Sequence, residues 1–272
     1  MVTIVVFHPR DLRWDDSTVS WSFANGARGR FAQAPATRSI GLSGSVTILR
    51  TKIALPAGHT ASGRKAFALL DSEGRLSGVD VHRTFTTASV VKAMLLVAYL
   101  RRLGAHGERR VDPSSASFLY PMIHISDNQS ATACWRIVGD SGLYAVARAA
   151  GMTDFSVSGF WLAAMLSPAD QARFLFEMDS LIPREFVGYA GFLLSTIEPS
   201  QTWGVPPVAR PLGYRVFFKD GSEPTRLGQL VHQVDRLEGH GRTFAIAVMT
   251  DGDPTMQYGI DTISGVAGAL LR

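Results

Sequence analysis

The sequence has a single cysteine, Cys134, among its 272 residues. It therefore contains no intrachain disulfide and no paired-cysteine metal or redox site. Its histidines lack HExxH-type spacing, and the chain has no GxSxG elbow, Walker loop or GxGxxG motif. We therefore expect neither a metal nor an organic cofactor.

Charge is also sparse, at 18% of residues, with 27 Lys plus Arg against 23 Asp plus Glu. No basic run is longer than two residues, so we do not expect a nucleic-acid-binding protein. Only four of the basic residues are lysine, namely Lys52, Lys65, Lys92 and Lys219. A lysine is therefore unusual at any position of this chain.

Long apolar runs are missing, and no stretch of 18 apolar residues predicts a membrane span. The segment after Met1 has too few apolar residues and becomes acidic too soon for a secretory signal. On the sequence as written we expect a cytoplasmic protein; export would require a start codon elsewhere. The sequence does not indicate an oligomeric state.

The order of segments predicts an α/β (α+β) protein. We read residues 1–40 as an extension of doubtful order and residues 41–272 as one domain. Its sheet parts are expected at about 41–88 and 205–272, and its helical part at about 89–204. The expected strands are 64–71, 76–81, 214–219, 227–237 and 242–250, and the expected helices 89–103, 126–138, 143–150, 167–178, 184–196 and 256–271. This pattern indicates an antiparallel sheet flanked by terminal helices, with an inserted all-helical subdomain.

Ser89 precedes Lys92 by three residues at a predicted helix start. This spacing places both side chains on one helix face, where the amine can take the hydroxyl proton. A second pair with the same spacing, Ser62 and Lys65, has no helix to align it, and a lone pair of this kind arises readily by chance. Lys92, however, lies in an otherwise apolar helix, where burial lowers the pKa of a lysine.

Two further segments fit a site around Ser89. Ser126-Asp127-Asn128 offers a hydroxyl to relay a proton and an amide to hold a carbonyl, although these residue types are also common helix caps. Lys219-Asp220-Gly221 ends a predicted strand, where a cation and a strand edge can bind a peptide-like substrate. An ordinary turn is the alternative for that segment.

Taken in order, the three segments resemble the serine β-lactamase and penicillin-binding-protein superfamily, specifically the class A β-lactamase-related serine hydrolases. The resemblance covers roughly residues 64–272 and includes the segment Pro199-Ser-Gln-Thr-Trp-Gly204. It implies that Ser89 is the acylated nucleophile, Lys92 its general base and Ser126 the proton relay to the leaving group. Asn128 would hold the acyl side chain, Lys219 would supply positive potential, and the backbone N–H groups of Ser89 and Ser222, beside Gly221, would form the oxyanion hole.

The chain departs from the family pattern in three places, one of which is a shorter interval between Ser89 and Ser126. The stretch 155–169 has no carboxylate where a class A enzyme carries its deacylating glutamate, and Asp154 and Asp170 beside it are not confident substitutes. Asp220 replaces the Thr or Ser of the KTG motif, and an anion there should repel a β-lactam carboxylate. One of Arg215, Arg226, Arg236 and Arg242 is a candidate for binding a substrate carboxylate, without a basis for choosing among them.

We therefore expect a serine hydrolase that acts through an acyl-enzyme on β-lactams or related small amides, esters or peptides, with weak deacylation. The alternatives are a D-alanyl peptidase or transpeptidase, and a catalytically idle penicillin-binding or sensing domain. The natural substrate is not indicated.

Overall fold

A computed structural model describes residues 2–6, 19–22, 28–31, 49–53 and 63–271 of the chain. Its centre is a five-stranded antiparallel sheet in the order β6-β5-β11-β10-β9. These strands are β5 (Arg64–Leu70), β6 (Leu76–Val79), β9 (Arg215–Thr225), β10 (Gly228–Gly239) and β11 (Arg242–Asp253). Since β5 pairs with β11, the sheet joins segments from both sides of the helical region.

Three short antiparallel pairs lie outside this sheet. They are β1 (Val2–Val6) with β4 (Leu49–Ile53), β2 (Val19–Ser22) with β3 (Arg28–Phe31), and β7 (Phe85–Thr86) with β8 (Met165–Leu166). The pairing of β7 with β8 ties the segment just before Ser89 to the segment just before α4.

Local chemistry explains the turns of the main sheet. The Asp71 carboxylate accepts hydrogen bonds from the backbone N–H groups of Glu73 and Arg75, at 2.9 and 3.0 Å, and so closes the turn between β5 and β6. Between β10 and β11 only His240 and Gly241 remain, both with positive φ. Two such residues suit the tight hairpin that joins antiparallel strands.

The helices lie mainly between β7 and β9. They are η1 (Ala88–Val91), α1 (Lys92–Ala105), α2 (Pro113–His124), α3 (Asn128–Ala149), η2 (Trp161–Ala163), α4 (Pro168–Phe176), α5 (Met178–Leu181), α6 (Arg184–Ser195), η3 (Pro199–Gln201), α7 (Val205–Ala209) and η4 (Arg210–Leu212). Helix α8 (Met256–Leu270) follows β11. In α3 the backbone leaves the helical region at Gly139, so the element is two helical segments joined at a kink.

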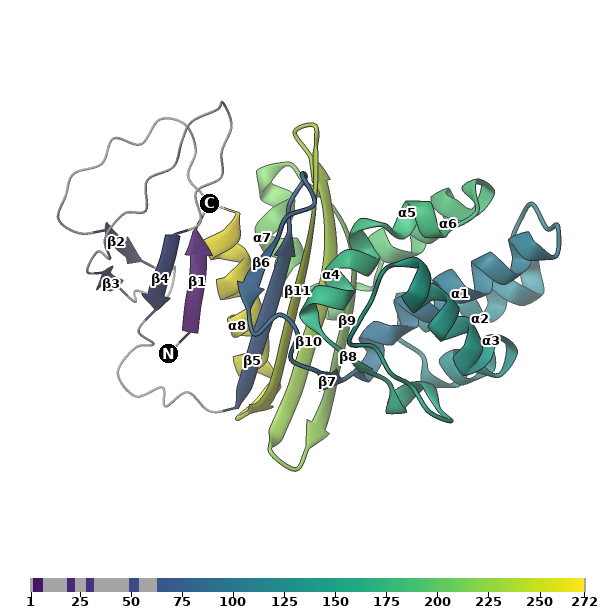
Figure 1. Ribbon diagram of the computed structural model, residues 1–272, viewed down its shortest axis with the longest axis horizontal. Coiled ribbons are helices and arrows are strands. Elements are labelled where there is room, and N and C mark those ends of the chain that lie inside the picture. Colours follow the sequence, from purple (N-terminus) through teal and green to yellow (C-terminus); the bar gives the residue numbers. More distant parts are fainter. Residues whose placement is uncertain (1, 7–18, 23–27, 32–48, 54–62, 272) are drawn as a thin grey trace.

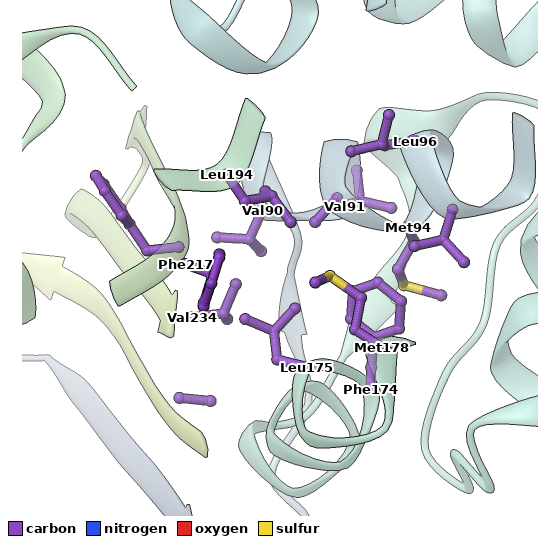
Figure 2. Close-up of a cluster of buried hydrophobic side chains, with 14 of the residues drawn as sticks. Val90, Val91, Met94, Leu96, Phe174, Leu175, Met178, Leu194, Phe217 and Val234 are labelled. Atoms are coloured by element: carbon purple, nitrogen blue, oxygen red, sulfur yellow. The ribbon is translucent and has the colours of Figure 1, made fainter. Parts of the chain in front are cut away.

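The sheet separates two helical layers: α8 and the short α7 lie on one face, and α1 to α6 lie on the other (Figure 1). Helix α1 runs through the centre of the helical layer, and every residue from Lys92 to Leu100 is buried. Figure 2 shows side chains from η1, α1, α4, α6, β9 and β10 packed into one apolar cluster, which includes Val90, Leu175, Phe217 and Val234. This packing fixes the start of α1 against the sheet.

The predicted fold class is confirmed, and each predicted strand and helix overlaps an observed one. Of the predicted terminal helices, the structure has the C-terminal one, α8. The described residues before Gly63 form only strands. Helix α2 and the strands at 2–6, 19–22 and 28–31 were not predicted. The rest of residues 1–40 lies outside the described residues, and the domain boundary at 41 stays a prediction. Across the described ranges, no helix is both long and apolar enough to cross a membrane.

Candidate active site

Ser89 lies in the tight turn that leads into α1. The Thr87 hydroxyl accepts a hydrogen bond from the Val91 N–H at 3.1 Å, and Ala88 adopts a positive φ of 45°. Val90 and Val91 are fully buried, whereas Ser89 is partly exposed. The apolar neighbours therefore anchor the turn and leave the Ser89 hydroxyl at a surface that a substrate can reach.

Lys92 connects the predicted site residues to one another. Its side chain is fully buried, and its Nζ lies 2.9 Å from Ser89 Oγ, 3.1 Å from Ser126 Oγ, 2.7 Å from Asn128 Oδ1 and 2.5 Å from the Ser126 carbonyl oxygen. One amine thus contacts both hydroxyls that the sequence analysis assigned to proton transfer. A base in contact with the nucleophile and with the relay is the geometry that acylation requires.

Burial, followed by the nearby Lys219 charge, lowers the pKa of Lys92 from 10.5 to about 7. Asp220 and Asp127 act in the opposite direction and raise the pKa. Near neutral pH a substantial fraction of Lys92 is therefore an uncharged amine that can accept the Ser89 proton.

The Ser126-Asp127-Asn128 segment is both a helix start and part of the site. Asp127 caps α3, since its carboxylate accepts the Ser130 N–H at 2.6 Å. Ser126, just before the cap, has a positive φ of 58°. The helix-cap interpretation is correct for Asp127, while Ser126 and Asn128 on either side of it contact Lys92.

Lys219 and Asp220 form a buried ion pair on β9. Lys219 Nζ donates hydrogen bonds to Asp220 Oδ1 at 2.7 Å and to the Asp220 carbonyl oxygen at 3.0 Å. The Lys219 side chain is fully buried, and 8% of the Asp220 side chain is exposed. The positive charge expected from Lys219 is thus balanced by its own neighbour.

Gly221 is the point where β9 comes closest to the nucleophile. A Cβ atom at this position would lie 2.7 Å from the Ser89 nitrogen and 3.1 Å from the Val90 nitrogen. Only glycine permits this approach, because a side chain would fill the space in front of the Ser89 N–H. Ser222 follows on the same edge strand, so the two backbone groups predicted for the oxyanion hole lie on neighbouring segments.

His232 was not selected from the sequence, yet it supports the site from behind. It lies opposite Gly221 on β10 and is fully buried. Its Nδ1 accepts the Thr250 N–H at 3.2 Å, and its Nε2 lies 3.0 Å from the Thr86 carbonyl oxygen, to which it donates. Burial lowers the pKa of His232 to about 4, so a neutral ring links the segment before Ser89 to the sheet.

The stretch 155–169 presents an aromatic ring to Lys92 instead of a carboxylate. Trp161 is fully buried, its ring centroid lies 5.2 Å from Lys92 Nζ, and its Nε1 donates to Thr132 Oγ1 at 3.2 Å. Asp170 accepts the N–H groups of Thr153 and Asp154, at 2.9 and 2.8 Å. The indole is therefore the group from this stretch that faces the base.

Asp154 is also engaged in the local structure. Its carboxylate accepts a hydrogen bond from Ser167 Oγ at 2.7 Å and lies 2.8 Å from His82 Nδ1. Both acids that flank the stretch thus stabilise the turn and the start of α4. In the described part of the chain, no group of three or more His, Cys, Asp or Glu side chains is arranged to hold a metal.

The candidate arginines do not lie beside Asp220. The residue opposite Asp220 across the sheet is Gln233. Its amide oxygen accepts the Val205 N–H and its amide nitrogen donates to the Trp203 carbonyl oxygen, both at 2.7 Å. Arg236 lies further along β10 and pairs with Asp179 and Glu238. Arg215 pairs with Glu238, Arg226 lies in the β9–β10 turn, and Arg242 begins β11.

The structure thus brings Ser89, Lys92, Ser126 and Asn128 into direct contact and places the Lys219–Ser222 strand segment against Ser89. This fold and this arrangement define a serine hydrolase of the β-lactamase type.

Comparison with known proteins agrees with this class. The family model described as "Beta-lactamase enzyme family" matches residues 106–272, so the chain belongs to that family. The matched range contains the Ser126 and Lys219 segments, whereas Ser89 and Lys92 precede it. A search of curated proteins finds no match.

Solved structures share the fold over about three quarters of this chain. A β-lactamase from Sphaerobacter thermophilus is 19% identical, with a TM-score of 0.64 over 76% of this chain and 90% of that one. A β-lactamase from Xanthomonas campestris is 18% identical, with a TM-score of 0.66 over 76% and 90%. A class A β-lactamase from Mycobacterium abscessus is 19% identical, with a TM-score of 0.64 over 76% and 92%. At these identities the similarity establishes the fold.

Proposed function

We propose that this protein forms an acyl-enzyme on Ser89 with β-lactams or related amides and esters, and that it releases the acyl group slowly. The observation that carries the proposal is the contact of Lys92 Nζ with both Ser89 Oγ and Ser126 Oγ, at 2.9 and 3.1 Å. It is supported by family membership and by the burial that brings the pKa of Lys92 to about 7.

In the acylation step, the neutral Lys92 amine takes the proton of Ser89 Oγ as that oxygen bonds to the substrate carbonyl carbon. The carbonyl oxygen becomes an oxyanion, which the N–H groups of Ser89 and Ser222 would stabilise. As the bond from carbon to the leaving nitrogen or oxygen breaks, the proton passes from Lys92 through Ser126 to the leaving atom. The product is an ester of Ser89 with Lys92 again uncharged, and Asn128 is placed to hold the acyl side chain.

Hydrolysis of that ester needs a base that activates a water molecule. The segment that would supply it contributes the Trp161 indole, which accepts no proton, and the neighbouring Asp154 and Asp170 are held by hydrogen bonds elsewhere. Lys92 is the remaining base, and the acyl group lies against it. We therefore infer that acylation is faster than deacylation.

The test is intact-protein mass spectrometry over time with a panel of penicillins, cephalosporins and activated esters. Wild type is compared with Ser89→Ala and with Ser72→Ala, a control for an exposed serine in the β5–β6 turn. The proposal predicts an adduct that requires Ser89 and lasts for hours. Rapid decay of the adduct would contradict slow release, and the absence of an adduct with every compound would contradict acylation. Faster loss on adding an amine acceptor would favour the transpeptidase alternative.

A further inference from the structure

Asp220 places a carboxylate inside the reaction site. It follows Lys219 directly and precedes the glycine that approaches Ser89. Its charge acts on two other groups: it raises the pKa of Lys92 and also that of the buried Asp235 on β10. Asp220 therefore acts electrostatically at the reacting atoms.

Among the described residues, neither lysine of the site is an unpaired cation during acylation. Both hydrogen bonds of Lys219 Nζ go to Asp220, and Lys92 is uncharged when it acts as the base. Of the arginines near the late strands, Arg236 is paired with Asp179 and Glu238, and Arg215 with Glu238. The residue opposite Asp220 is the uncharged Gln233, whose amide is hydrogen-bonded to Trp203 and Val205.

One carboxylate oxygen of Asp220 is still available. Oδ1 accepts from Lys219, whereas Oδ2 has no partner among the described residues and is not among the buried unpaired atoms. With 8% of the side chain exposed, Oδ2 is the part of Asp220 that solvent reaches. An available carboxylate oxygen accepts a hydrogen bond and cannot donate one.

Three exposed apolar side chains belong to residues next to the site or in contact with it. Ile125, which precedes Ser126, is 48% exposed, and Leu162, which follows Trp161, is 37% exposed. Met256 is 39% exposed, and its sulfur lies 3.8 Å from Ser222 Oγ. These three neighbours contribute no charge to the site.

We propose that Asp220 makes this site select substrates whose leaving-group end carries a hydrogen-bond donor, such as a carboxamide or an ammonium group, in place of a carboxylate. Asp220 Oδ2 accepts a hydrogen bond from the donor, while a carboxylate at the same place would face the Asp220 oxygen that Lys219 does not bind. This inference rests on the proposed acylation of Ser89 and names the class of substrate for that reaction.

The experiment uses three aryl esters that share one acyl group. They differ only in the meta substituent of the phenol leaving group, which is a carboxylate, a carboxamide or an aminomethyl group. The second-order rate constant for acylation is measured for each ester and divided by its rate of hydroxide hydrolysis, which removes differences in leaving-group reactivity. For wild type we expect the carboxamide and aminomethyl esters to react at least about tenfold faster than the carboxylate ester.

The matched variants are Asp220→Asn and Asp220→Thr, with Asp80→Asn as a control for an exposed acid on a distant turn. Both Asp220 variants should abolish the wild-type preference or reverse it in favour of the carboxylate ester, because Lys219 is then unpaired, and the control should keep the wild-type preference. Circular dichroism shows whether each variant is folded. One folded Asp220 variant is enough for the test.

The possible failures are distinguishable. Ser89-dependent acylation at equal normalised rates for all three esters, or faster reaction of the carboxylate ester, would overturn the selection while the proposed function stands. A wild-type preference that survives both Asp220 variants would assign it to another group. Absence of Ser89-dependent acylation with every ester would overturn the proposed function itself.

Discussion

The charge pair at Lys219 and Asp220 allows the pKa of Lys92 to be moved in either direction. With a pKa of about 7, roughly a tenth of Lys92 is neutral at pH 6 and roughly nine-tenths at pH 8. If neutral Lys92 is the base, the second-order rate of Ser89 acylation should rise about tenfold between these two pH values.

Two substitutions should shift this profile in opposite directions. Asp220→Asn removes a negative charge that raises the pKa of Lys92, so the midpoint should move to lower pH. Lys219→Gln removes a positive charge that lowers this pKa, so the midpoint should move to higher pH. A unit charge about 10 Å away, at an effective dielectric constant of about 20, contributes roughly 1.7 kcal/mol, which is about one pKa unit.

The assay is the rate of acylation by a neutral aryl ester, whose own charge does not change between pH 5 and 9. Because the second-order constant reports the free enzyme, its midpoint is that of unacylated Lys92. Asp80→Asn should leave the midpoint unchanged. Midpoints that move in the same direction in both variants, or that do not move, would refute the role of Lys92 as the titrating base.

Three further predictions concern stability and access. Because the folded pKa of Lys92 is about 7 and the unfolded value is near 10.5, the unfolded chain binds one more proton between these values, and the unfolding free energy should rise by about 1.4 kcal/mol per pH unit. The unfolding free energy, measured with urea at pH 7.5 and 9, should show this rise in wild type and not in Lys92→Met. An equal pH dependence of the unfolding free energy in the two proteins would contradict the burial argument. Gly221→Ala should remain folded but acylate at least about a hundredfold more slowly, because its Cβ would meet the Ser89 nitrogen at 2.7 Å; near-normal acylation would show that β9 moves freely. His232→Phe should lower the unfolding free energy by roughly 2–4 kcal/mol, because it leaves the Thr86 carbonyl and the Thr250 N–H unpaired, and a change below 1 kcal/mol would contradict this role.

The motifs were readable from the sequence because their spacing is local. Ser89 and Lys92 lie one helical turn apart, so their contact follows from the helix alone. The late strands were identifiable from their apolar runs and short turns. Helix α2 was missed, although Asp112 followed by Pro113 is the same cap-and-proline signal that identified α4 at Ser167 and Pro168.

The contacts that change the chemistry were not readable, because they depend on side-chain directions across the fold. The sequence placed Asp220 in the site, but not the ion pair by which it neutralises Lys219. From the sequence, Phe160 and Trp161 fit either core packing or part of a substrate wall. The position of Trp161 against Lys92 arises from the path of the stretch 155–169. His232 has no local signal, because its partners are 146 and 18 residues away.

The most direct test of the central claim is a pre-steady-state measurement of product release from a chromogenic aryl ester. Fast acylation followed by slow release predicts a burst of one product molecule per protein molecule, then a much slower steady rate. The burst should be absent in Ser89→Ala and present in Ser72→Ala. Ser89-dependent turnover that is linear from the start, without a burst, would contradict the account, because release of the acyl group would then be at least as fast as its formation.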